Sequence, residues 1–108
     1  MAQNFRRFAV QATNSAGTVF TSNSFDTVIG IRIANITAAA ITMDVFVSVG
    51  GSTTRYIVKD LSIPPASSVE LVQGGAKFVM ESSDVLKVQS SAANSADVYV
   101  SVVDSIST

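Results

Sequence analysis

The fold of this chain is decided by two β-type runs joined by a glycine pair: TMDVFVSV at residues 42–49, GGS at 50–52 and TTRYIVKDL at 53–61. The first run has a period of two, which is typical of a strand with one buried face. Its alternating apolar side chains are predicted to face the core: Met43, Val45, Val47 and Val49. Asp44 and Ser48 are predicted to face outward. A glycine pair between two such runs favours a hairpin, so the runs are predicted to form adjacent antiparallel strands.

The same rhythm continues on both sides of this hairpin. Further short β-type runs occupy residues 5–12, 19–21, 27–35, 69–72, 77–80, 85–89 and 98–103. Within one of them Ile29, Ile31 and Ile33 are predicted to share a face. No helix is predicted, because Ala38-Ala39-Ala40 has β-branched neighbours and Pro64-Pro65 breaks a helix. The pattern predicts an all-β fold: a single-domain β-sandwich of about eight or nine short antiparallel strands.

Length and composition limit how the chain can be stabilised. Its 108 residues suffice for one domain, 1–108, and 47% of them are hydrophobic, which is enough for a core. Because cysteine is absent, no disulfide can reinforce the domain. There are seven basic and eight acidic residues against 16 serines and nine threonines. A surface so poor in charge costs little to desolvate and favours a homo-oligomer; the alternative is a weakly soluble monomer with a hydroxyl coat.

The residue types needed for most catalytic and metal sites are missing. The chain has no histidine and no cysteine, which excludes Ser-His-Asp, Cys-His and His-based metal sites in this chain alone. The eight carboxylates are dispersed, and Asp60, Asp84 and Asp97 are interpreted as turn or strand-end residues. We therefore predict no enzyme, no catalytic, cofactor-binding or metal site, and no cofactor. A glycosidase would require the fold to bring two carboxylates together.

Two further features have alternative readings. Tyr56 and Tyr99 are candidate platforms for a sugar, although packing in or beside the core is favoured because nothing in the sequence clusters them. Asn35-Ile36-Thr37 matches a glycosylation acceptor, which is interpreted as a chance match.

The N-terminal segment is the predicted interface. Phe5, Arg6, Arg7 and Phe8 combine residue types enriched in interfaces, and residues 1–8 are interpreted as a docking arm. The alternative is that Phe5 and Phe8 cover the subunit's own core. The two arginines are a weak footprint for nucleic acid, and no apolar run follows them as a signal peptide requires. No run reaches the ~18 apolar residues of a membrane span. Neither nucleic acid nor membrane is predicted as a partner.

The whole chain resembles a family of small virion structural proteins of tailed phages, especially phages of marine cyanobacteria. The resemblance rests on these stretches: Asn4–Phe8, Ile33–Thr37, the glycine-pair hairpin, Tyr56–Asp60, Ile63–Pro65, Glu81–Val88 and Ala96–Ile106. It implies a capsid decoration, neck or tail-associated protein that is made in the host cytoplasm and ends in the virion. Its partners would be identical copies and other virion proteins. The competing function is a carbohydrate- or receptor-binding β-module that uses its loop tips.

Overall fold

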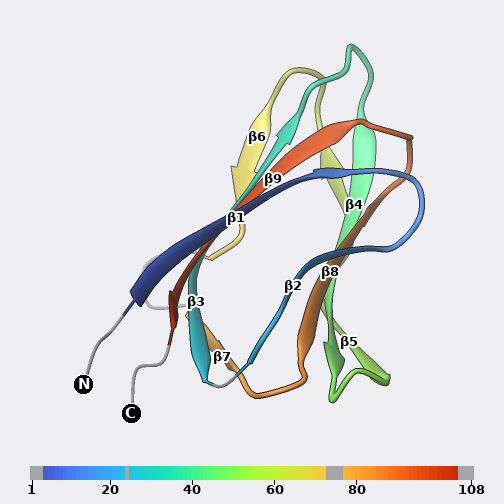
Figure 1. Cartoon of the computed structure of the whole chain (residues 1–108). Helices are drawn as coiled ribbons and strands as arrows, with labels where there is room; N and C mark the ends of the chain where they lie inside the picture. The colour runs from blue at the N-terminus through green and yellow to red at the C-terminus, as the bar shows by residue number, and fades with distance from the viewer. Residues whose placement is uncertain (1–3, 24, 73–76, 105–108) are drawn as a thin grey trace.

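The computed structural model describes residues 4–23, 25–72 and 77–104, and these form two packed antiparallel sheets (Figure 1). The strands are β1 (Asn4–Ala12), β2 (Gly17–Thr21), β3 (Asp26–Asn35), β4 (Ile41–Val49), β5 (Thr53–Ile63), β6 (Ser68–Glu70), β7 (Phe78–Met80), β8 (Val85–Ser90) and β9 (Ala96–Asp104). The prediction of an all-β sandwich with eight or nine strands is confirmed. In the described part of the chain, no helix is long and apolar enough to span a membrane.

The strand pairing is nested. β4 pairs with β5, β3 with β6 and β7, β2 with β8, and β1 with β9. The chain is thus folded like one long hairpin, which is then rolled so that β9 also pairs with β3 and β8 with β4. The resulting sheets are β1-β9-β3-β6, with β7 also on β3, and β2-β8-β4-β5. Two four-strand layers connected in this way are a jelly roll, in which β6 and β7 share one edge of β3 as a single interrupted strand.

The core lies between the two sheets. Its fully buried side chains come mainly from the four central strands: Val28, Ile31 and Ile33; Val98, Val100 and Val102; Met43 and Val45; Leu86 and Val88. At the edge, Phe8 of β1 stacks on Phe20 of β2, with ring centroids 4.4 Å apart. This stack joins the first two strands across the sandwich, because β1 and β2 belong to different sheets.

The prediction for the inward face of β4 is correct at three positions and wrong at two. Met43, Val45 and Val47 are buried, but Val49 is 43% exposed and Ser48 only 7% exposed. Val49 ends the strand at the Gly50-Gly51 turn, beyond the reach of the core. Ser48 is covered because β4 is an interior strand, with Val85 of β8 on one side and Thr54 of β5 on the other. The predicted hairpin is confirmed.

The prediction for β3 is wrong at Ile29. The pairing of β3 with β9 shifts register between Val28 and Gly30, so Ile29 is an extra residue in a β-bulge. Val28 takes the core position instead and is completely buried. Ile29 is half-buried and lines a surface hollow with residues of β1 and β9. A bulge of this kind interrupts the alternation that periodicity alone assumes.

Asn35 connects two loops at one end of the sandwich. Its side chain is 2% exposed. The amide nitrogen lies within hydrogen-bonding distance of the carbonyl oxygens of Ala39 (2.8 Å), Ile63 (3.1 Å) and Pro64 (3.1 Å). The side-chain oxygen accepts from the N–H (2.9 Å) and the hydroxyl (2.7 Å) of Thr37. The Asn-Ile-Thr triplet thus has a structural role in the fold, and its amide is turned inward, away from any modifying enzyme.

At the opposite end, Asp84 holds two turns together. Its carboxylate accepts a hydrogen bond from the backbone N–H of Gly50 and another from that of Glu81, both at 2.9 Å. This agrees with its interpretation as a turn residue. Asp60 has a positive φ of 56° within β5, and its N–H donates to the Asp44 carboxylate at 2.8 Å. Asp97 is the second residue of β9 and is exposed.

Candidate interaction surface

We call the solvent-facing side of the sheet β1-β9-β3-β6/β7 the outer face. It carries a row of mainly apolar residues, two of which are exposed. Cross-strand register aligns Phe5 of β1, Val103 of β9, Thr27 of β3 and Val79 of β7. Paired residues share one face of a sheet, so these side chains lie side by side. Phe5 is 76% exposed and Val79 62% exposed, while Thr27 and Val103 are half-buried. We call these four residues the apolar row.

The next positions along the strands continue this surface. A hollow of about 310 Å³ is lined by Phe5, Arg6, Arg7, Ile29, Ser101 and Val102. It adds the displaced Ile29 to the apolar surface beside the row. Farther along the strands, Tyr99 of β9, Arg32 of β3 and Glu70 of β6 form a second, polar row. The outer face therefore changes from apolar to polar along the strand direction.

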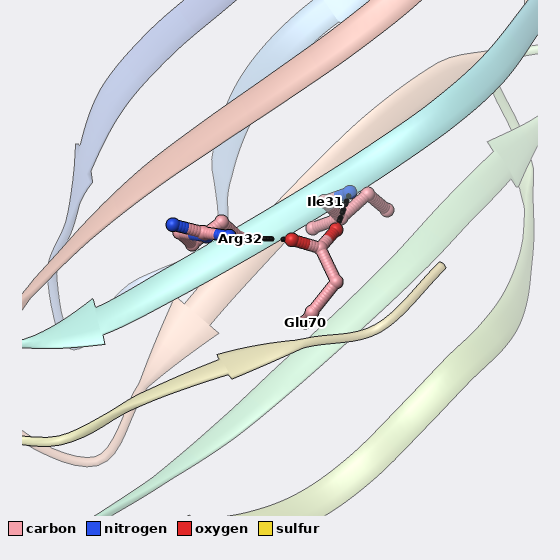
Figure 2. A network of polar contacts seen from close by, with 3 residues as sticks. All are labelled: Ile31, Arg32 and Glu70. Atoms are coloured by element: carbon pink, nitrogen blue, oxygen red, sulfur yellow. Dashed lines mark hydrogen bonds and ion pairs between the residues drawn. The ribbon is translucent and has the colours of Figure 1, made fainter. Parts of the chain in front are cut away.

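Beside the polar row, β3 has a gap in its strand pairing. β7 pairs with residues 26–28 of β3 and β6 with residues 32–34, so neither strand covers the residues between. Glu70 fills part of this gap: one carboxylate oxygen accepts the N–H of Ile31 at 3.0 Å, and the other accepts the Nε–H of Arg32 at 3.3 Å (Figure 2). Leu71 donates its N–H to the Ile31 carbonyl at 2.9 Å. The arrangement fixes both charged side chains on the surface.

The four predicted interface residues do not act as one unit, and residues 1–3 of the predicted docking arm lie outside the described residues. β1 pairs with β9 along its whole length, from Asn4–Asp104 to Ala12–Ala96, so this segment is an edge strand of the sheet. Phe5 and Arg7 are exposed, whereas Phe8 is half-buried and packs against the core. The Arg6 guanidinium lies 4.9 Å above the Phe8 ring. Phe8 therefore covers the core, as the alternative predicted, whereas Phe5 faces outward and its role in an interface stays a prediction.

The solvent-facing side of the other sheet, β2-β8-β4-β5, is more polar. Its aligned positions include Thr18, Lys87, Gln89 and Asp44, together with a tilted ring pair of Phe46 and Tyr56 at 5.4 Å. Lys59 lies 5.1 Å from the Tyr56 ring centre and 3.8 Å from the Asp44 carboxylate. The two tyrosines considered as sugar platforms thus lie on opposite sheets, and Tyr56 already has a lysine over its ring.

Sequence reasoning missed Ile29, Thr27, Val79 and Val103 as surface residues of interest. Val79 lies between Phe78 and Met80 in the short strand β7, and both of these neighbours pack in or against the core. These residues form a row only when the strands pair in their observed register, and the sequence does not show that register. Among the described residues, no group of three or more carboxylates could hold a metal ion.

The comparisons with known proteins concern the fold. No protein-family model matches the sequence, and no curated protein matches it. A chain of the acid-stable capsid of Helicobacter pylori bacteriophage KHP30 is similar with a TM-score of 0.56 at 13% identity, over 95% of this chain and 87% of that one. A pentameric capsid protein from metagenomic phage sequences gives 0.52 at 21%, over 92% and 60%. A chain of Bacillus endospore appendages, a family of disulfide-linked pili, gives 0.57 at 14%, over 98% and 88%.

Proposed function

We propose that this chain is a non-enzymatic structural subunit of a phage particle that assembles with identical copies and other virion proteins through the outer face. The apolar row is the observation that carries the proposal. The likeness in fold to phage capsid chains supports the class of protein, while the function itself is argued from this surface because a fold hosts many functions.

The main favourable contribution to the proposed contact is the removal of apolar side chains from water. Phe5 and Val79 keep most of their side-chain area in solvent, and Ile29 and Val103 keep part of theirs. Burying a large apolar side chain contributes roughly 1.5–3 kcal/mol, so covering Phe5 and Val79 favours association. Charged residues make up only 14% of the chain, and the charged residues that line the hollow beside the row are Arg6 and Arg7. Exposed apolar groups that lie together in this way favour a protein partner.

The finer assignment follows the sequence resemblance: a decoration, neck or tail-associated protein of a tailed phage of cyanobacteria, made in the host cytoplasm and located in the virion. One of the capsid proteins that share the fold is pentameric, which is consistent with self-assembly. The likeness to disulfide-linked pili suggests a fibre subunit as a second candidate. Because this chain has no cysteine, such a fibre would need to be held by non-covalent contacts.

Substitution of Val79 by glutamate is expected to weaken self-association at least tenfold, because it places a charge on one of the two most exposed apolar side chains of a contact that excludes water. The matched control is Val49→Glu: Val49 is also an exposed strand valine, but it lies beside the β4–β5 turn, away from the row. Light scattering coupled to size exclusion, over a range of concentrations, measures both. A wild-type chain that stays monomeric at about 1 mM, or two variants that behave alike, would contradict an interface at the apolar row.

The location in the virion has its own test. We expect mass spectrometry of gradient-purified particles to detect the chain at a fixed number of copies per major capsid protein, and salt washing to leave it attached. Detection only in the host cell lysate would show that the chain is not a component of the particle.

A further inference from the structure

We propose that the polar row of the outer face, Tyr99, Arg32 and Glu70, binds an acidic sugar unit: a pyranose that carries a carboxylate. This inference does not depend on the proposed structural role. It differs from the loop-tip site expected of a carbohydrate-binding module, because the residues lie on the strands of a sheet face.

The site is a hollow with a low floor and three walls. It measures about 440 Å³ and is lined by Gly30, Arg32, Glu70, Tyr99 and Ser101. Gly30 and Ser101 are cross-strand neighbours with little or no side chain, and they form the floor. Tyr99, Arg32 and Glu70 come from three adjacent strands and form the walls. The volume lies in the range of small-molecule sites.

Arg32 supplies a binding group for a carboxylate. Glu70 contacts the guanidinium at Nε, and Figure 2 shows the far end of the guanidinium pointing away from Glu70. The two terminal nitrogens contact no acceptor among the described residues, and the side chain is 67% exposed. A guanidinium edge of this kind can donate two parallel hydrogen bonds to a carboxylate. Glu70 also accepts the Ile31 N–H, so it holds Arg32 in place and is itself anchored to the backbone.

Tyr99 supplies the surface for the sugar ring. It is 49% exposed, and it is the cross-strand partner of Arg32. An aromatic ring beside a hydrogen-bonding group offers an apolar face and a polar edge together, which matches the two kinds of surface on a pyranose. Tyr56 offers no equivalent site, because Lys59 lies over its ring. Glu70 already neutralises part of the Arg32 charge, so the ligand's carboxylate is expected at the edge of the guanidinium that faces away from Glu70 (Figure 2).

The hollow is unsuited to hydrolysis of the bound sugar. Among its described lining residues, Glu70 alone carries a carboxylate, whereas glycoside hydrolysis ordinarily uses a pair. Both oxygens of Glu70 already accept hydrogen bonds from Ile31 and Arg32. The geometry points to recognition without cleavage.

The test compares trigalacturonic acid with maltotriose, a neutral trisaccharide of the same length, by calorimetry and by NMR titration of the folded chain. We expect the acidic sugar to bind at least tenfold more tightly and to shift the resonances of residues 30, 32, 99 and 101. Arg32→Lys and Tyr99→Ala are each expected to weaken binding at least tenfold. Ser101→Val, which raises the floor, should also weaken it without removing any polar contact to Arg32.

The matched controls lie on the other sheet. Arg55→Lys and Tyr56→Ala change the same residue types at exposed positions and should leave the affinity within twofold. A thermal melt of each variant confirms that it is folded. Absence of binding, equal affinity for maltotriose, or equal losses in the two sets of variants would overturn the proposal. If self-association covers the polar row, the Val79→Glu variant leaves the row accessible, so sugar binding is also measured on this variant. Failure of the sugar site and failure of the apolar interface then give different results.

Discussion

Replacement of Asn35 by alanine is expected to lower the free energy of unfolding by about 3–5 kcal/mol, because a buried polar group left without a partner costs roughly 1–3 kcal/mol. The substitution removes the amide that faces the carbonyls of Ala39, Ile63 and Pro64. It also removes the oxygen that accepts from Thr37. Two loops would lose their common anchor at once. Urea denaturation followed by circular dichroism measures the change.

Two further variants separate the causes. Asn14→Ala removes the same side chain from an exposed loop and should change stability by less than about 0.5 kcal/mol. Asn35→Asp keeps the acceptor for Thr37 but loses the donors, so it should be nearly as harmful as alanine. If the aspartate variant matched the wild type, the carbonyl contacts would contribute little and the account of this end of the sandwich would be wrong.

Substitution of Val45 by aspartate is expected to unfold the domain at room temperature. Val45 is completely buried between Val88 of β8 and Val58 of β5. An unpaired carboxylate there costs about 5 kcal/mol or more, which is comparable to the whole stability of a small domain at roughly 5–15 kcal/mol. Loss of the far-UV β signal and loss of dispersion in the proton NMR spectrum would report the unfolding.

The same substitution at Val49 is its control. Val49 lies four positions farther along the same strand, at the same parity, but it is 43% exposed. Val49→Asp should therefore leave a folded protein with a loss of about 1 kcal/mol or less. Similar losses at the two positions would mean that the assignment of the inner face of β4 is wrong.

The strands and the two-sheet fold could be predicted from the sequence, but the bulge in β3 and the burial of some strand residues could not. Period-two runs and the Gly50-Gly51 turn sufficed for the strands and for the β4–β5 hairpin, since both signals are local. The bulge at Ile29 was not predictable, because it depends on how β3 pairs with the distant β9. Ser48 was placed outward by alternation alone, yet strands on both sides cover it.

The candidate surface was predictable only in part. Phe5 and Arg7 were identified from their residue types and their place near the N-terminus. The rest of the surface is assembled by register: Val79 and Thr27 are far apart in the sequence, and Arg32 meets Glu70 across nearly forty residues. A search by residue type also cannot separate Tyr56 from Tyr99. Their difference lies in the neighbours, a lysine over one ring and an open hollow beside the other.

The nested strand pairing has a consequence for the order of folding. Val49 meets Thr53 across a turn of three residues, whereas Ala12 meets Ala96 across most of the chain. The entropy of loop closure grows by about 0.6 kcal/mol for each doubling of length, so direct closure of β1 on β9 costs about 3 kcal/mol more than closure of the hairpin. Nesting avoids that cost, since each pair can close over strands that are already joined. Folding is therefore expected to start at the Gly50-Gly51 turn and to proceed outward. Substitutions in this turn should change the folding rate, and the edge strand β1 should join the sheet late.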